Sequence, residues 1–295
     1  MTEVRRRHPE WLKVRAPAGD GFFATRAIVQ EHQLHTVCEE ARCPNIGECW
    51  GHGTATFMLL GDHCTRNCAF CAVAHGRGGP PDPEEPRRVA DAARALRLRH
   101  VVVTSVNRDD LPDGGAGHFA ATAVALRTVV PECRVEVLVP DFLGMQAAGD
   151  VVVDAPIDIF NHNTETVPRL YRRVRAGARY ERSLSLLRRA KERRPALLTK
   201  TGLMLGLGEE RGEVETVLRD VRAVGCDILT LGQYLRPSAA HLPVTRYVPP
   251  EEFAELRAAA LALGFRHVES GPLVRSSYHA WAHVPDGARP RPLAL

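Results

Sequence analysis

The sequence predicts an α/β protein built on a partial (β/α)6 TIM-type barrel, with an extension at each end. Three observations favour this fold class. Short apolar runs alternate with helix-like stretches, polar residues follow several of the apolar runs, and both flanking segments lack the alternation. Alternating strands and helices favour parallel strands joined by right-handed crossovers. We therefore expect an N-terminal extension over 1–55, a barrel over 56–270 and a C-terminal segment over 271–295.

The strands and helices of the barrel are expected in strict alternation. The apolar runs predict strands at 57–60, 100–106, 134–139, 157–161, 197–205, 227–231 and 265–268. The stretches between them predict helices at 85–98, 117–130, 164–174, 183–193, 209–224 and 250–263. Pro86 and Pro250 suit a first helical turn, and Gly225 and Gly264 suit a helix end. Polar residues cluster at 104–110, 140–141, 161–163 and 232–234, where strands end. In such folds the active site lies at these strand ends.

Composition excludes several classes of protein. The chain is 44% hydrophobic and 25% charged, which is ordinary for a globular protein. No apolar run approaches the roughly 20 residues that a membrane span needs, and no signal-peptide pattern follows the first basic residues. We therefore expect a cytoplasmic protein that does not bind a membrane. The net charge of +4 is mild, and the basic clusters lack the interleaved aromatic residues that would indicate nucleic-acid binding.

The eight cysteines are the strongest chemical signal. In the reducing cytoplasm, clustered cysteines indicate metal or redox chemistry rather than disulfides. Six of the eight lie between Cys38 and Cys71. The other two, Cys133 and Cys226, stand alone in apolar surroundings and are interpreted as core residues.

The first cysteine triplet of interest follows the first predicted barrel strand. Cys64, Cys68 and Cys71 are spaced C-x3-C-x2-C. Three thiolates on one short loop can hold three irons of a [4Fe–4S] cluster and leave the fourth iron open. A zinc site would need another ligand, such as His63 or His75.

A second triplet lies upstream, in the N-terminal extension. Cys38, Cys43 and Cys49 are spaced C-x4-C-x5-C, again without a fourth cysteine nearby. This pattern predicts a second cluster whose fourth ligand is unusual or absent. The alternative is a structural zinc site completed by His35 or His52.

The first triplet resembles the cluster loop of the radical S-adenosylmethionine superfamily, with Phe70 at its aromatic position. Both triplets together, with the stretch Arg275-Ser276-Ser277-Tyr278, resemble the lipoyl synthase family over nearly the whole chain. The resemblance implies a sulfurtransferase of lipoate biosynthesis with two [4Fe–4S] clusters and S-adenosylmethionine. It would insert sulfur at C6 and C8 of a protein-bound octanoyl-lysine, with the upstream cluster as sulfur donor. Unactivated C–H bonds require such cofactor chemistry.

The same resemblance supplies a ligand and a set of partners. It implies that Ser277, rather than Ser276, completes the upstream cluster, although serines in such a place also serve as loop or helix caps. It also implies octanoylated carriers, namely the lipoyl domain of 2-oxoacid dehydrogenase E2 and the glycine cleavage H protein. An electron donor such as ferredoxin or flavodoxin and an iron–sulfur cluster carrier complete the expected partners.

Candidate contacts to S-adenosylmethionine are the polar residues at strand ends. They are Phe70 beside the cluster and, at the strands, Asn107, Asp109, Asn163, Glu165 and Lys200. For Asn163 a loop cap is an equal alternative, and for Glu165 a carboxylate at a helix N-terminus. Asn107 stands where the family has aspartate. Two other functions stay open, a sulfur-inserting enzyme similar to biotin synthase and a non-catalytic iron–sulfur sensor.

Overall fold

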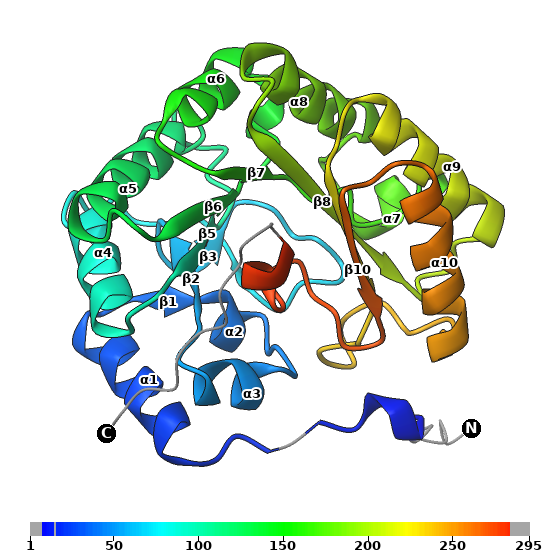
Figure 1. The fold of residues 1–295 in the computed structure, drawn as a ribbon, viewed down its shortest axis with the longest axis horizontal. Coiled ribbons are helices and arrows are strands. Elements are labelled where there is room, and N and C mark those ends of the chain that lie inside the picture. Colours follow the sequence, from blue (N-terminus) through cyan, green and yellow to red (C-terminus); the bar gives the residue numbers. More distant parts are fainter. Residues whose placement is uncertain (1–7, 15, 284–295) are drawn as a thin grey trace.

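The computed structural model describes residues 8–14 and 16–283. Within this part of the chain, eight strands form one curved sheet in the order β1-β2-β5-β6-β7-β8-β9-β10. The strands from β2 to β10 are parallel, whereas β1 (His35–Thr36) runs antiparallel to β2. Helices surround this ring of strands (Figure 1). The sheet ends at β1 and β10 without closing, which confirms a partial barrel.

The seven predicted barrel strands are all present. They are β2 (Thr56–Leu59), β5 (His100–Ser105), β6 (Arg134–Leu138), β7 (Ile159–Asn161), β8 (Leu198–Leu205), β9 (Ile228–Gln233) and β10 (His267–Gly271). Six helices cover them, namely α4 (Glu85–Ala95), α5 (Ala116–Val129), α6 (Gln146–Asp154), α8 (Tyr180–Arg193), α9 (Arg211–Ala223) and α10 (Pro250–Ala262). Core side chains such as Val103 of β5 and Phe119 of α5 are fully buried between the two layers.

Two predictions about helices were wrong. Helix α6 lies where no helix was predicted, and its Gly149 lets the Leu186 side chain of α8 pack closely. The predicted helix at 164–174 begins later, with the 3-10 turn η3 (Pro168–Leu170) and α7 (Tyr171–Val174). Glu165 has φ of 65° and forms a bridge to Leu203 of β8, so this part of the segment is not helical.

The N-terminal extension packs against the barrel. It contains η1 (Glu10–Leu12), α1 (Asp20–Glu31), α2 (Val37–Glu40) and α3 (Ile46–Gly51). Trp50 of α3 is fully buried and stacks on Phe22 of α1 at 5.4 Å between ring centroids. Because β1 pairs with β2, the extension contributes a strand to the barrel sheet. The division of the chain at 55 and 270 stays a prediction.

The C-terminal segment turns back into the ring after β10. Its last described element, the 3-10 turn η4 (Ala280–His283), lies in the middle of the ring in Figure 1 and packs against β5 and β10. Gly232 of β9 permits this course, because a Cβ atom there would stand 2.0 Å from the Val274 carbonyl oxygen. Among the helices of the described residues, we find none with the length and apolar character needed to cross a membrane.

Candidate active site

A cavity of about 710 Å³ opens at the carboxyl ends of the barrel strands. Both cysteine triplets line it, although they lie on different parts of the chain. Ser276 and Ser277 line it as well, from the returning C-terminal segment. The fold therefore brings together the residues that the sequence assigns to two clusters and to the unusual ligand.

The loop carrying the barrel triplet follows β2 and includes two short parallel strands, β3 (His63–Cys64) and β4 (Ala74–His75). Cys64 faces several N–H donors. Its sulfur accepts from the backbone N–H of Arg66 at 3.4 Å and of Asn107 at 3.3 Å, and the Asn107 side-chain amide lies 3.6 Å away. Hydrogen-bond donors of this kind stabilise a thiolate. The thiolate is the form in which a cysteine binds a metal. Asn107 thus contacts a cysteine directly, while its own Oδ1 has no partner among the described residues.

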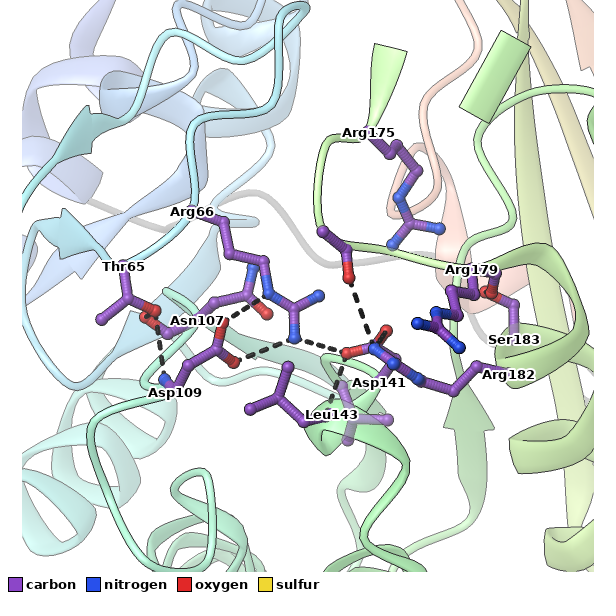
Figure 2. A network of polar contacts seen from close by, with 12 residues as sticks. Thr65, Arg66, Asn107, Asp109, Asp141, Leu143, Arg175, Arg179, Arg182 and Ser183 are labelled. Carbon is purple, nitrogen blue, oxygen red and sulfur yellow. Dashed lines mark hydrogen bonds and ion pairs between the residues drawn. The ribbon is translucent and has the colours of Figure 1, made fainter. Parts of the chain in front are cut away.

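Arg66, between Cys64 and Cys68, fixes the cluster loop to the barrel (Figure 2). Its guanidinium donates two hydrogen bonds to Asp109, at 2.7 and 2.9 Å, and one to Asp141, at 2.6 Å. Arg182 of α8 donates to the other oxygen of Asp141 at 2.9 Å. The Arg66 side chain is 6% exposed and that of Asp141 is fully buried. Burial opposes ionisation of Asp141, but Arg66 and Arg182 hold its pKa down at about 2.

This network also explains two sequence-predicted contacts. The Thr65 hydroxyl donates to the Asn107 carbonyl and accepts the Asp109 backbone N–H. Asp109 therefore positions the loop and does not line the cavity. The expectation that its carboxylate contacts S-adenosylmethionine is corrected, because both of its oxygens accept from Arg66.

Lys200 is the second correction. Its side chain is fully buried and its amino group lies 2.7 Å from the Glu136 carboxylate. Glu136 also accepts from Asn161, which fixes this ion pair inside the sheet. Because Lys200 does not line the cavity, we no longer expect it to contact S-adenosylmethionine.

A group of three polar residues after β7 lines another part of the cavity. It consists of Asn163, Glu165 and Arg175. Asn163 donates to Glu165 at 3.0 Å, and Arg175 donates to the Asn163 carbonyl at 2.8 Å. Burial raises the pKa of Glu165. The Asn163 Oδ1 is buried without a partner among the described residues. Glu165 is not at the N-terminus of a helix, because the next helical turn begins at Pro168. Its positive φ is a strained backbone conformation of the kind found at functional sites.

Phe70 and the remaining barrel cysteines complete this wall of the cavity. Burial raises the pKa of Cys68 to about 11 and that of Cys71 to about 12. These thiols therefore stay protonated until a metal centre binds them, and binding must release protons. The three-sulfur donor set on one loop fits an iron–sulfur cluster with an open iron.

The upstream triplet lies in the N-terminal extension, where the segment that follows β10 contacts it. Cys38 lies on α2, Cys49 on α3 and Cys43 between them, and burial raises the pKa of Cys38 to about 12. Asn45 donates from this loop to the Leu273 carbonyl oxygen at 2.7 Å. Glu48 accepts from Tyr278 at 3.1 Å and lies 3.0 Å from the His279 ring nitrogen.

Sequence reasoning missed three charged residues of this site. Arg66 and Arg175 were not singled out in the sequence, and Asp141 was noted only as one of the polar residues at strand ends. Their partners are 75 positions away for Arg66 and 12 for Arg175. Two of them had a usable signal, Asp141 by its place at a strand end and Arg66 by its place between Cys64 and Cys68. Arg275, part of the C-terminal stretch that carries the family resemblance, lines the cavity, and burial lowers its pKa while Cys43 and Glu165 oppose that shift.

Comparison with known proteins decides the family. Residues 58–221 match the radical S-adenosylmethionine superfamily, and residues 1–43 match the N-terminal domain of lipoyl synthase. The lipoyl synthase of Nitrosococcus oceani is 60% identical over 280 residues, covering 95% of this chain and 86% of that protein. The lipoyl synthase of Chloroflexus aggregans is 58% identical and covers 96% of this chain and 92% of that protein.

The chain belongs to the lipoyl synthase family.

Solved structures agree on the fold. Streptococcus suis SuiB bound to its precursor peptide SuiA aligns over 77% of this chain and 52% of that chain, with a TM-score of 0.57 at 11% identity. HydG, a maturase of the [FeFe]-hydrogenase, aligns over 80% of this chain and 60% of that chain, with a TM-score of 0.54 at 15% identity. Membership of the lipoyl synthase family makes the chain a radical S-adenosylmethionine enzyme and implies a [4Fe–4S] cluster with that cofactor. The alternatives of a biotin synthase-like enzyme and of a sensor find no support here.

Proposed function

We propose that this lipoyl synthase family enzyme inserts two sulfur atoms, at C6 and C8 of an octanoyl chain attached to a carrier lysine. One observation carries the proposal. Both cysteine triplets and Ser277 line the same cavity, so a radical source and a sulfur source would face one substrate chain. The carriers would be the lipoyl domain of 2-oxoacid dehydrogenase E2 and the glycine cleavage H protein.

The residues present fit two clusters. We assign Cys64, Cys68 and Cys71 to the radical cluster, and Cys38, Cys43, Cys49 and Ser277 to the second. When bound, the first cluster and S-adenosylmethionine supply a carbon radical able to abstract hydrogen, and the second cluster supplies sulfide. A serine oxygen is a harder ligand than a thiolate and matches iron–sulfur chemistry less well. This difference supports a cluster that is taken apart during the reaction.

The polar cavity residues would hold S-adenosylmethionine. Glu165 and the unpartnered Oδ1 of Asn163 offer acceptors for its amino group, and Arg175 stands beside them. The unpartnered Asn107 Oδ1 lies next to Cys64. The absence of a side chain at Gly202 makes space for Asn163, because a Cβ atom on Gly202 would stand 2.9 Å from the Asn163 Oδ1.

The apolar part of the cavity suits the octanoyl chain. Met58, Val102, Leu138 and Met204 line it from four strands. An apolar wall orients a hydrocarbon chain and keeps water from a reactive radical. Turnover would further need an electron donor such as ferredoxin or flavodoxin and an iron–sulfur cluster carrier to restore the second cluster.

An anaerobic single-turnover assay tests the proposal. The reconstituted chain is analysed for iron and sulfide, then given reductant, S-adenosylmethionine and a peptide bearing octanoyl-lysine. We expect about eight irons per chain and a gain of two sulfurs by mass spectrometry. A hexanoyl-lysine peptide, which has no C8, serves as the control and should not gain two sulfur atoms. Cleavage of S-adenosylmethionine without any sulfur gain would refute the substrate, and about four irons would refute the second cluster.

A further inference from the structure

Three side chains of metal-binding type meet inside the barrel and do not line the cavity that the cysteine triplets line. They are His267 and Glu269 of β10 and His283 of η4, and one ligand atom from each lies within 4.8 Å of the others. His267 Nε2 and a Glu269 carboxylate oxygen are 3.4 Å apart. Ligands of a tetrahedral ion with bonds near 2.0–2.1 Å stand about 3.4 Å apart. Two of the three are therefore already spaced for one ion.

His283 is the most informative member of the group. It is 2% exposed, and neither of its ring nitrogens has a hydrogen-bond partner among the described residues. Its ring centroid lies 4.8 Å from that of His267, with a tilt of 32° between the planes. A buried polar ring without any partner is costly, so a ligand for its nitrogen would remove a penalty.

The surroundings favour a cation on these three residues. The His283 ring is 2% exposed, and burial of this kind disfavours the charged imidazolium and favours the neutral ring, which has a lone pair for a metal. Glu269 supplies a negative charge, and the nearby Lys200 is neutralised by Glu136. The side chains of His267 and Glu269 are 26% and 30% exposed, which leaves a path from solvent.

We propose that His267, Glu269 and His283 bind one divalent transition-metal ion, Zn²⁺ or Fe²⁺, separate from the iron–sulfur clusters. Two histidines and one carboxylate with open positions are a donor set used for both ions. The ion would tie η4 to β10. Because Ser276 and Ser277 lie in the chain between these two elements, it would also restrain the proposed ligand of the second cluster. This inference does not depend on the sulfur-insertion reaction.

Zinc absorption spectroscopy on the cluster-loaded chain provides the test. One equivalent of Zn²⁺ is added anaerobically, loosely bound metal is removed with a chelator, and the zinc edge is recorded. We expect one zinc per chain with nitrogen and oxygen ligands near 2.0–2.1 Å, whereas cysteine-bound zinc would show sulfur near 2.3 Å. A parallel sample with ⁵⁷Fe²⁺, read by Mössbauer spectroscopy, tells which ion the site retains after chelation.

Variants separate the site from chance binding. His283→Ala and Glu269→Gln should lose the retained ion, and His32→Ala, which removes a histidine outside the group, should keep it. Glu269→Gln preserves side-chain size, so it reports binding even where His283→Ala does not fold. Zinc found only on sulfur, or an ion retained equally by both site variants, would overturn the proposal. Failure of sulfur insertion alone would not affect it.

Discussion

The two cysteine triplets face one cavity but are held in different ways. The barrel triplet is fixed through Arg66 and Asp141, whose side chains are 6% and 0% exposed. The upstream triplet is fixed by Asn45 and by Glu48 with His279, the latter pair being 42% and 38% exposed. Buried charge pairs are costly to break, whereas exposed pairs contribute about 0–1 kcal/mol. The difference supports the proposal that the first cluster persists while the second is dismantled and rebuilt.

Removing a ligand from each triplet should give the largest and most distinct losses. Cys68→Ala should abolish cleavage of S-adenosylmethionine, and Cys43→Ala should retain cleavage but abolish sulfur insertion. Each variant should lose about four irons. Cys133→Ala, a buried cysteine outside the triplets, is the control and should keep both clusters. Equal loss of cleavage in both triplet variants would contradict a division of labour.

The next largest effect is expected at the proposed serine ligand. Ser277→Ala should lower sulfur insertion by about tenfold or more while cofactor cleavage stays within about twofold. Ser276→Ala is the matched control, since both serines line the cavity, and it should leave both rates near those of the parent chain. Measurement of 5′-deoxyadenosine and of sulfur gain in one reaction separates the two steps. The reverse ranking of the two variants would move the ligand to Ser276.

A smaller effect, on stability, is expected at the buried network of the barrel loop. Arg66→Met leaves Asp109 without its cation and Asp141 with Arg182 alone. Breaking a buried pair costs about 3–5 kcal/mol, and the remaining Arg182 contact puts this change at the lower end. The thermal midpoint should fall on the order of 10 °C. Arg66→Lys keeps the charge and should recover part of the loss, but a single ammonium cannot reproduce the two-oxygen contact to Asp109.

The exposed pair Arg87–Glu84 gives the control for that experiment. Arg87→Met should change the midpoint by no more than about 2–4 °C, because it breaks only exposed ion pairs, which contribute little to stability. If both arginine variants lowered the midpoint equally, the network shown in Figure 2 would not be what fixes the cluster loop.

The smallest effect is expected where the C-terminal segment meets the upstream triplet. Glu48→Gln weakens the contacts to Tyr278 and His279, and the thermal midpoint should change by about 2 °C or less. Iron release from the second cluster to a chelator should nevertheless be faster than in the parent chain. Glu31→Gln, at the exposed end of α1, should change neither quantity. Unchanged iron release in Glu48→Gln would mean that this contact does not hold the segment.

The fold could be predicted from the sequence because its signals are local. Each barrel strand is a compact apolar run, and glycine or proline marks several helix ends. Helix α6 was missed because its run Val151-Val152-Val153 is β-branched and Gly149 weakens a helical pattern. The segment near Glu165 was misjudged because its pairing with Leu203 of β8 overrides the local helical pattern.

The site could be predicted only where residue type and spacing carry the chemistry. The six cysteines and Ser277, which their patterns and the family resemblance single out, line one cavity, and their roles as cluster ligands stay predictions. Lys200 and Asp109 were misplaced because their true partners, Glu136 and Arg66, are distant in sequence. A charged residue at a strand end can face the cavity or a neighbouring element, and only the three-dimensional packing distinguishes the two.

The contact between Asn45 and Leu273 has a consequence for the protein during its synthesis. The two residues are 228 positions apart, so at the usual pace of about 5–20 residues per second the first waits roughly 10–50 s for the second to be made. For that interval Cys38, Cys43 and Cys49 exist without the C-terminal segment that contacts their loop. The order of synthesis thus exposes these thiols to stray metals and oxidants before their own pocket exists.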